Sequence, residues 1–398
     1  MSIAHHIRNA LQHASMIRRV ADEGIKMRQD GQGPVFDLSL GNPLIEPPPA
    51  FYESMKQLLA RGKTGLHRYM PNNGYPETRA AIAAWLRTDL DLPFTGQHVF
   101  LSVGAAGGIN TLFKALLGPS EEVIFFAPYF VEYGFYTSNH GGLPVIVETN
   151  DEFQIDAESL RKAVTEKTRI VMINTPNNPT GVVYTAESLR NISEVLRDAS
   201  TRYGRPIYLL NDTPYRRMVY DEYVDAQAPD PMHFYEHTII ATSFSKDLAI
   251  PGERIGYVAF SPQIEDIQEI DEAMAFCARI LGFVNAPAWM QHLLPSLLDT
   301  QVDMSWYAKK RQRLLSFLRL TGYTCTTPKG AFYIYPKAPG GDDMAFYQEL
   351  KRHRVLVVPG SGFGRAGYFR IAYCMNDETI DGALPAFAKA YETLHKPE

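Results

Sequence analysis

The sequence predicts an α/β fold with a larger unit, built on a mostly parallel seven-stranded sheet between helices, and a smaller α+β unit. Two observations point to this organisation. Between about residues 80 and 260, seven short apolar runs alternate with helical patterns, which is typical of a parallel sheet covered on both faces. After about residue 320, short strands and helices follow each other without that regular alternation, which indicates the smaller unit.

The chain begins with an expected helix and a turn-rich boundary. Apolar residues recur every three or four positions over residues 3–29, which predicts an amphipathic helix that ends near Gly31 and Gly33. Glycine and prolines between residues 41 and 49 mark a domain boundary. We therefore expect a large domain over 44–295 and a small domain from 1–43 and 296–398, with the first helix packed on the small domain.

The remaining elements follow from apolar runs and helical spacing. The expected strands of the sheet are 99–103, 122–126, 144–147, 169–173, 206–210, 238–241 and 255–260, and the helices between them include 106–117, 157–165 and 185–203. A helical region over 263–320 precedes the tail, where we expect strands at 331–335, 355–358 and 368–372 and helices at 342–353 and 377–394. Parallel sheets bind ligands outside the carboxyl ends of their strands, so residues after each strand are the candidates for a site.

Composition excludes several classes of protein. Lys+Arg total 39 and Asp+Glu 44, for a net charge of −5, so the basic surplus of a nucleic-acid binder is missing. No apolar run is long enough to predict a membrane span, and the first residues do not resemble a secretory signal. Three widely spaced cysteines predict no disulfide framework and a reducing, cytoplasmic location. No spacing of ligands predicts a metal site.

A lysine with hydroxyls beside it follows the strand 238–241. Ser243, Ser245 and Lys246 come directly after this strand, and Arg254 lies eight residues beyond the lysine. A lysine in an enclosed site can lose its proton and form a Schiff base, while hydroxyls and an arginine can hold a phosphate. For such a segment alone, a solvated surface lysine is the simpler interpretation.

Three further segments follow strands and also have ordinary explanations. Asp212 lies in the segment 211–215 after a strand. A carboxylate buried there would need a cation as its partner. The ordinary interpretation is an aspartate that caps the N-terminus of a helix. Residues 177–181, Asn-Asn-Pro-Thr-Gly, read as a turn by default. The small residues of 104–108 allow backbone amides to approach an anion, or simply form a tight strand-to-helix connection. The occurrence of all four segments together, each after a strand, is not explained by the ordinary interpretations.

These segments resemble the class I/II aminotransferases, pyridoxal-phosphate enzymes of fold type I, of which aspartate aminotransferase is an example. The Ser-x-Ser-Lys segment with its trailing Gly-x-Arg-x-Gly-Tyr (252–257) carries most of the resemblance, followed by 177–181. Similar stretches occur at 40–43, 69–79, 328–333 and 358–370, so the resemblance covers nearly the whole chain. It implies transfer of an amino group between an L-amino acid and a 2-oxo acid, through a Schiff base (aldimine) on Lys246 and a pyridoxamine phosphate form.

The resemblance also implies catalytic roles. Lys246 would form the Schiff base and move the proton between the substrate and the cofactor. Asp212 would pair with the protonated pyridine nitrogen and so keep the ring an electron sink. Tyr215 and Asn178 would hydrogen-bond the phenolic oxygen of the cofactor. The phosphate would be held by residues of the first and last segments, namely Gly104, Ala105, Ala106, Ser243, Ser245 and Arg254.

Substrate recognition and assembly follow from the same resemblance. Arg370, together with Asn178, would clamp the substrate α-carboxylate, and Gly41 would line the substrate entrance, over which the N-terminal segment would close. Phe130 would stack on the pyridine ring, where many relatives have tryptophan. Tyr69 would reach the phosphate in the neighbouring subunit, which implies a homodimer with shared active sites.

The identity of the substrates is left open by the sequence. Relatives that use aspartate usually offer a second cation to its distal carboxylate, and in one subgroup this is a lysine at the position of Ala106. Tyr129, Phe130 and Phe283 suit aromatic or aliphatic side chains. The family implies 2-oxoglutarate or pyruvate as the acceptor.

The residues bear differently on three alternatives to an aminotransferase. A carbon–sulfur β-lyase of the same fold would keep Lys246, Asp212, Tyr215 and Arg370, so these residues do not exclude it. A regulator of this fold would carry a DNA-binding domain, for which residues 1–43 are too short. A nicotinamide oxidoreductase rests only on the Gly-x-Gly-x-x-Gly pattern at 362–367, which leads into an expected strand rather than a helix.

Overall fold

Seven strands form one sheet in the order β2-β8-β7-β6-β5-β3-β4 in the computed structural model, which describes residues 3–12, 16–62 and 64–395. Only β8 in this sheet runs antiparallel to its neighbours β2 and β7. The strands are β2 (Val99–Ser102), β3 (Glu122–Ala127), β4 (Leu143–Glu148), β5 (Thr168–Ile173), β6 (Tyr208–Asp212), β7 (Thr238–Ser243) and β8 (Gly256–Phe260). The prediction of a mostly parallel, seven-stranded sheet is confirmed.

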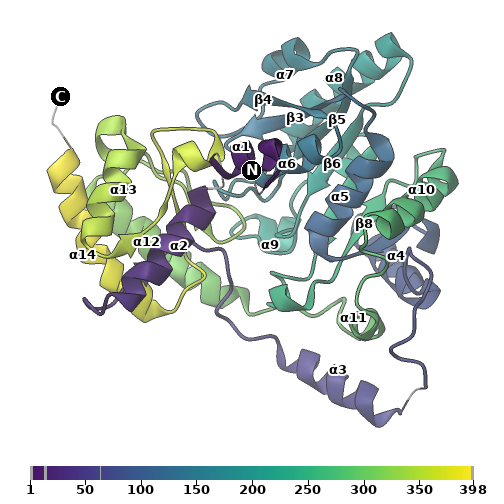
Figure 1. The fold of residues 1–398 in the computed structure, drawn as a ribbon, viewed down its shortest axis with the longest axis horizontal. Helices are drawn as coiled ribbons and strands as arrows, with labels where there is room; N and C mark the ends of the chain where they lie inside the picture. Colours follow the sequence, from purple (N-terminus) through teal and green to yellow (C-terminus); the bar gives the residue numbers. More distant parts are fainter. Residues whose placement is uncertain (1–2, 13–15, 63, 396–398) are drawn as a thin grey trace.

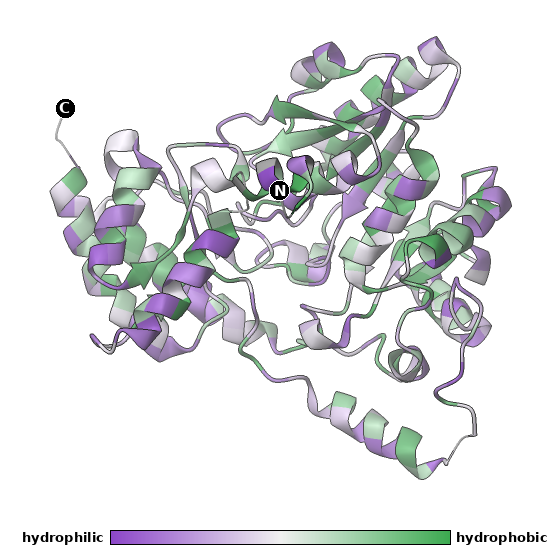
Figure 2. Cartoon of the chain, viewed as in Figure 1, coloured by the Kyte–Doolittle hydropathy of each residue, from purple (hydrophilic) through white to green (hydrophobic). Residues whose placement is uncertain are grey.

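The sheet is buried on both faces because successive side chains of a strand point to opposite sides. In β3, Val123 and Phe125 pack with the helices α5 and α10, whereas Ile124 and Phe126 pack with α8. Figure 2 shows the strands as a predominantly hydrophobic centre between helices with polar outer faces. This two-sided burial explains the near-continuous apolar runs in the sequence.

The helices around this sheet form one lobe of the molecule, from which α3 projects (Figure 1). They are α3 (Pro49–Ala60), α4 (Pro76–Leu90), α5 (Gly104–Leu116), α6 (Glu132–Asn139), α7 (Ala157–Ala163), α8 (Ala186–Tyr203), α9 (Tyr223–Ala226), α10 (Ile267–Ile280) and α11 (Ala288–Leu293). Helix α8 shows how local sequence sets such bounds: the Thr185 hydroxyl caps its first turn, and Gly204, with φ 66°, ends it in the left-handed conformation.

The second lobe is built from the C-terminal elements and the N-terminal segment. Strands β9 (Tyr333–Ile334), β11 (Val358–Pro359) and β12 (Phe369–Ala372) form an antiparallel sheet, and β1 (Phe36–Asp37) pairs in parallel with β10 (Val355–Leu356). Helices α2 (Met16–Gln29), α12 (Met304–Thr321), α13 (Asp343–Arg352) and α14 (Asp377–Leu394) surround them (Figure 1). Val20 of α2 is buried in this core, and Glu23 binds Lys351.

Several predicted boundaries differ from the observed ones. The single helix expected over 3–29 is described as α1 (His5–Gln12) and α2, with residues 13–15 outside the described part. Strands β6 and β7 run two residues further than expected, so Asp212 and Ser243 are the last residues of their strands. The glycine pattern at 362–367 forms a turn before β12, as expected. The domain boundaries at 43/44 and 295/296 stay predictions.

The sequence predicts neither a membrane-spanning helix nor a disulfide framework. Among the described residues, no helix has the length and apolar character needed to cross a membrane. Cys277, Cys325 and Cys374 are all free thiols. The cytoplasmic location stays a prediction.

Candidate active site

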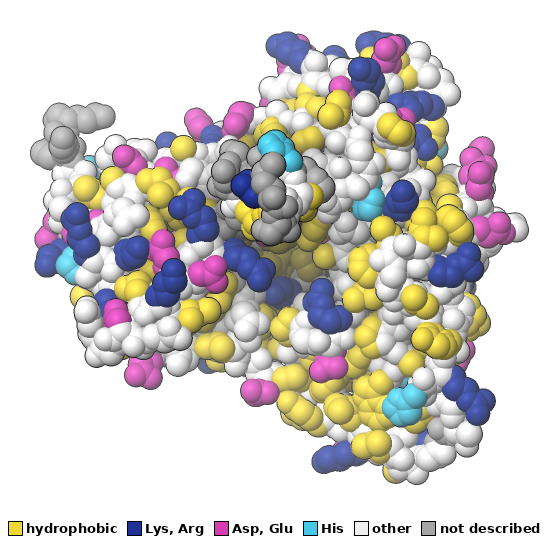
Figure 3. Space-filling model, in the orientation of Figure 1, with side chains coloured by type: hydrophobic (Ala, Val, Ile, Leu, Met, Phe, Trp, Pro, Cys, Tyr) yellow, Lys and Arg dark blue, Asp and Glu magenta, His cyan; other side chains and the backbone are white. Residues whose placement is uncertain are grey.

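A cavity of about 290 Å³ lies at the carboxyl edge of the sheet, between the two lobes. Figure 3 shows the surface hollowed at this place, with Lys and Arg side chains around the hollow. The cavity brings together most of the predicted site residues: Gly41, Ala105, Ala106, Phe130, Asn178, Asp212, Tyr215, Ser243, Ser245, Lys246, Arg254 and Arg370. They come from segments spread over more than 300 residues, so the fold and not the local sequence gathers them.

Lys246 presents its amine to the cavity directly after β7. Nζ donates a hydrogen bond to the carbonyl oxygen of Gly41 over 2.6 Å and lies 5.6 Å from the ring centroid of Phe332. Burial, together with the positive charges of Arg370 and Arg254, lowers the pKa of this amine to about 8. A lysine with such a pKa is partly neutral near physiological pH and can act as a nucleophile or a base.

Asp212 ends β6 as a buried carboxylate that is only half satisfied. The hydroxyl of Tyr133 donates a hydrogen bond to Oδ2, but Oδ1 is buried without a hydrogen-bond partner among the described residues. Burial raises the pKa of this carboxyl to about 7, and the hydrogen bond from Tyr133 opposes the shift. Oδ1 therefore lacks, within the described chain, the cation or donor that a buried carboxylate oxygen requires.

Tyr215 lies three residues after Asp212 and faces the same cavity. Its hydroxyl is 2.7 Å from that of Tyr333. Burial raises the pKa of the Tyr215 hydroxyl well above its ordinary value, so it is a neutral donor near pH 7. Asn174, the residue after β5, supports this edge. Its Nδ2 donates to the Asp212 carbonyl over 2.6 Å, and its Oδ1 accepts from the backbone N–H of Asn178 over 2.6 Å.

The opposite end of the cavity is suited to an anion. It contains the first turn of α5, with Ala105 and Ala106, and the paired hydroxyls of Ser243 and Ser245, 3.1 Å apart. The Arg254 guanidinium forms no ion pair with a carboxylate of the described chain and lies beside Gly104, where a Cβ would stand 2.8 Å from Nη2. Gly104, with φ 65°, thus leaves room for the arginine.

Arg370 is a buried arginine without a carboxylate partner among the described residues. Its side chain lies between two rings, with Cζ 4.6 Å from the centroid of Tyr333 and 4.8 Å from that of Phe363. It donates to Asn178 Oδ1 over 2.8 Å and to the Ser39 carbonyl, while Nε has no hydrogen-bond partner. A guanidinium that is 2 % exposed and unpaired is well placed for a bound carboxylate.

The sequence interpretation missed several residues of the cavity wall. These are Ile17, Ile109, Tyr133, Tyr136, Asn174, Pro214, Pro251 and Tyr333. Tyr133 and Tyr136 lie on α6, a helix that the sequence analysis did not predict. Tyr333 lies in the stretch 328–333 that carried part of the resemblance, which was the one available signal for it.

Four residues singled out from the sequence do not line the cavity, and one of them is Gly104, which lies beside Arg254. Tyr69 is 89 % exposed, so its expected role toward a neighbouring subunit stays a prediction. Tyr129 stacks on Phe125 outside the wall, and Phe283 lines a separate small pocket beside Phe100. For the two aromatic residues, the proposed fit to a substrate side chain is not supported by the structure.

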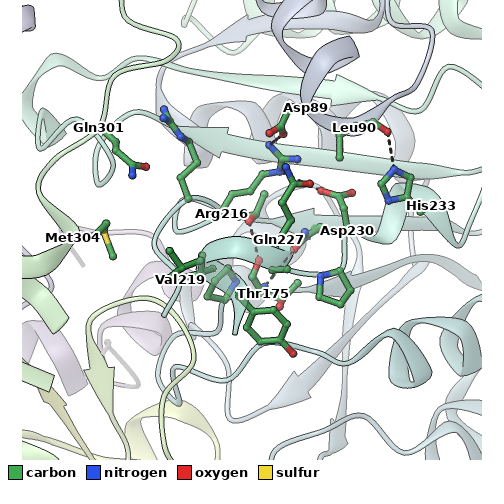
Figure 4. Close-up of a pocket in the computed structure, with 18 residues that line it drawn as sticks. Asp89, Leu90, Thr175, Arg216, Val219, Gln227, Asp230, His233, Gln301 and Met304 are labelled. Atoms are coloured by element: carbon green, nitrogen blue, oxygen red, sulfur yellow. Dashed lines mark hydrogen bonds and ion pairs between the residues drawn. The ribbon is translucent and has the colours of Figure 1, made fainter. Parts of the chain in front are cut away.

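A second cavity, of about 300 Å³, lies on the other side of the loop that follows β6. Figure 4 shows Arg216 there between Asp89 and Asp230, and His233 against the Leu90 carbonyl. Tyr215 and Arg216 therefore face different cavities, although they are adjacent in sequence. Because Arg216 is neutralised by two carboxylates, this cavity lacks the unpaired charges that characterise the first one.

The described residues include no group of three or more His, Cys, Asp or Glu side chains that could hold a metal ion. The first cavity brings together a lysine, an aspartate and two arginines. Together with the fold that gathers them, these groups define an enzyme of fold type I. The profile of the family "Aminotransferase class I and II" matches residues 33–387, so the chain belongs to this family and is an aminotransferase.

Similar proteins agree with this assignment. An aspartate aminotransferase of Pyrococcus horikoshii is 31 % identical over 396 residues, which cover 95 % of each chain. An aspartate/prephenate aminotransferase of Thermus thermophilus is 31 % identical over 381 residues, covering 92 % of this chain and 93 % of that one. The crystal structure of an amino transferase from Eubacterium rectale superposes with a TM-score of 0.94 at 36 % identity and covers 100 % of both chains.

Enzymes of this family use pyridoxal phosphate, and the cavity fits that group on three counts. The unpartnered Asp212 Oδ1 requires a donor such as a protonated ring nitrogen. The α5 N-terminus, two serines and Arg254 suit a phosphate. Lys246 lies in the same wall with an amine of lowered pKa. The residues present are therefore compatible with the cofactor.

Proposed function

We propose that this chain is a pyridoxal-phosphate-dependent aminotransferase that uses Lys246 as its catalytic amine and passes an amino group from an L-amino acid to a 2-oxo acid. One observation carries the proposal: the amine of Lys246, the unpartnered oxygen of Asp212 and the unpaired guanidinium of Arg370 line a single cavity. Separately, each group would be costly to bury without a partner. Together they complement a cationic ring, an aldehyde and a carboxylate.

The cofactor is proposed to be held by groups at both ends of the cavity. Asp212 Oδ1 would accept the ring N–H, while Tyr215 and Asn178 would donate to the phenolic oxygen. The ring would lie against Phe130. Ser243, Ser245, Arg254 and the amides of Gly104, Ala105 and Ala106 would hold the phosphate. When bound, pyridoxal phosphate supplies the carbonyl that carries the amino group and the ring that accepts electrons from the substrate α-carbon.

Lys246 would act twice, first as a nucleophile and then as a proton carrier. With a pKa of about 8, about a tenth of its amine is neutral at pH 7, which is enough for attack on a carbonyl carbon. Once a substrate amine has displaced it, the freed Nζ would take the proton from the substrate α-carbon. The Gly41 carbonyl, 2.6 Å away, holds this amine at the substrate entrance.

Arg370 would hold the substrate by its α-carboxylate and so position its α-carbon relative to Lys246. A guanidinium offers two parallel N–H donors to a carboxylate, and the flanking rings and Asn178 hold its plane. This would orient the α-carbon toward Nζ, and such positioning contributes strongly to rate.

We further propose that the enzyme is a homodimer with shared active sites. Tyr69 and two residues of α3, Tyr52 and Leu59, are exposed, at 89 %, 44 % and 65 %. Figure 3 shows hydrophobic side chains gathered over the region around α3, where the helix projects from the lobe. Such a patch suits burial against a second copy, and Tyr69 would then reach the phosphate in the partner's site.

Covalent labelling of the lysine tests this assignment. Borohydride reduction of enzyme loaded with pyridoxal phosphate is expected to attach the cofactor to the peptide that contains Lys246. Lys246→Ala should give no label and lose amino-group transfer by at least about a thousandfold. Lys167→Ala, at an exposed lysine, is the matched control. Labelling at another lysine, or full activity of Lys246→Ala, would refute the proposal.

A further inference from the structure

The charges of the active-site cavity limit what substrate it can hold. Among the described residues that line it, three side chains are cationic: Lys246, Arg254 and Arg370. Under the proposed function, on which this inference rests, Lys246 serves the amino group, Arg254 the phosphate and Arg370 the α-carboxylate. None is then left for a second carboxylate on the substrate.

The part of the wall that remains is apolar or neutral. Ile109, 1 % exposed, lies one helical turn beyond Ala105 and Ala106 on α5, so the three share a face toward the cavity. Ile17 of α2 and Phe130 also line it. Burial raises the pKa of the Tyr136 hydroxyl to about 12, so this side chain is uncharged near pH 7.

A second carboxylate in this cavity would lose its hydration without gaining an ion pair from the described chain. An unpaired buried charge is among the most unfavourable contacts in binding, whereas an apolar side chain gains from covering Ile17, Ile109 and Phe130. Ala106 also lines the cavity, at the position where the family resemblance implies a lysine in one subgroup of aspartate-using enzymes.

We propose that this aminotransferase acts on amino acids with one carboxylate and an uncharged, mainly apolar side chain that lies against Ile17, Ile109 and Phe130. If the same side chains bind both substrates, the acceptor is likewise a 2-oxo acid with one carboxylate. Aspartate and glutamate are disfavoured because the described residues of this chain offer the cavity no fourth cation.

Single-turnover kinetics test the proposal with the loaded enzyme. L-leucine, L-methionine and L-phenylalanine are compared with L-aspartate and L-glutamate, by the loss of cofactor absorbance. At least one neutral amino acid should react with kcat/KM about tenfold or more above both dicarboxylates. A faster reaction with aspartate or glutamate than with every neutral amino acid would overturn the proposal and leave the proposed function intact. No cofactor conversion by any amino acid would instead refute the proposed function.

Binding and a charge-introducing variant give independent evidence. In calorimetric titrations of the loaded enzyme, 4-methylvalerate should bind about tenfold more tightly than maleate. Ala106→Lys should raise kcat/KM for aspartate relative to leucine by about tenfold, and Ala106→Met, of similar length without charge, should not. Tighter binding of maleate to the original protein, or an equal rise in both variants, would contradict the assignment.

Discussion

The hydroxyl of Tyr133 donates a hydrogen bond to one oxygen of Asp212, and the other oxygen of that carboxylate is buried without a partner among the described residues. The two residues are 79 positions apart, on α6 and at the end of β6. Tyr133 itself is buried, so it has little freedom to turn away. The contact fixes the carboxylate plane and leaves Oδ1 directed to a donor in the cavity, which we propose to be the ring nitrogen of the cofactor.

Removal of the Tyr133 hydroxyl should weaken cofactor binding. The hydrogen bond lowers the pKa of Asp212, so its loss in Tyr133→Phe leaves less carboxylate ionised near pH 7. Hydrogen bonds to charged groups contribute about 1.5–3 kcal/mol, which corresponds to a roughly tenfold to hundredfold weaker affinity for pyridoxal phosphate. Equilibrium titration of the cofactor-free protein with pyridoxal phosphate, followed by absorbance, measures this affinity. The control is Tyr129→Phe, whose ring lies outside the cavity wall; equal loss in both variants would contradict this role.

The buried carboxyl of Asp212 should make the cofactor-free protein less stable as the pH rises. Its folded-state pKa is about 7 and its ordinary pKa is 3.8. Between these values the folded protein keeps a proton that the unfolded chain releases. The free energy of unfolding therefore falls with pH in this window, by at most about 1.4 kcal/mol per pH unit, and levels off above about pH 7.

Asp212→Asn tests that linkage, because an amide has no proton to release. Urea unfolding of the cofactor-free proteins should show little difference near pH 4 and a growing advantage of the variant up to pH 7. The same variant should hold pyridoxal phosphate less well, since the cationic ring would lose its counter-charge. A stability difference that does not change with pH would show that Asp212 is ionised normally.

Substitution of Arg370 should impair substrate capture rather than cofactor binding. In Arg370→Gln the bidentate donor is gone, and kcat/KM should fall roughly 30-fold to several thousandfold, equivalent to about 2–5 kcal/mol. The affinity for pyridoxal phosphate, measured on the same samples, should change by less than about threefold. Arg370→Lys keeps the positive charge but not the two parallel N–H donors of the guanidinium. Its kcat/KM should therefore lie between those of the original protein and Arg370→Gln. Loss of cofactor binding with substrate affinity retained would contradict the proposed role of Arg370 in substrate capture.

The proposed shared site can be examined with mixed dimers. Tyr69→Ala and Lys246→Ala are each expected to be nearly inactive. If Tyr69 acts in the partner's site, a hybrid dimer contains one site with both residues intact, and an equimolar mixture should recover about a quarter of the original activity. Co-expression with two affinity tags isolates the hybrid for assay. Recovery should be nil if Tyr69 acts within its own subunit, whereas full activity of Tyr69→Ala alone would show that Tyr69 acts in neither site.

The sequence sufficed for the elements of the sheet because apolar runs and turn residues are local signals. It could not show which strand is reversed, since the antiparallel β8 is as fully buried as the parallel β7. Lys246 and Asp212 were found because they lie in short motifs at strand ends. Tyr133 and Tyr333 were missed because their roles depend on contacts with Asp212 and Tyr215 that only the tertiary fold creates.

The central claim is that the cavity around Lys246 transfers amino groups, and a stoichiometric measurement tests it most directly. Enzyme loaded with pyridoxal phosphate is mixed with each common L-amino acid in the absence of a 2-oxo acid, and absorbance, oxo acid and ammonia are followed. An aminotransferase should release a single equivalent of oxo acid per site and no ammonia, with the cofactor left as pyridoxamine phosphate until a 2-oxo acid restores its yellow colour. Continued release of pyruvate and ammonia from an enzyme that stays yellow would contradict the claim and identify a lyase.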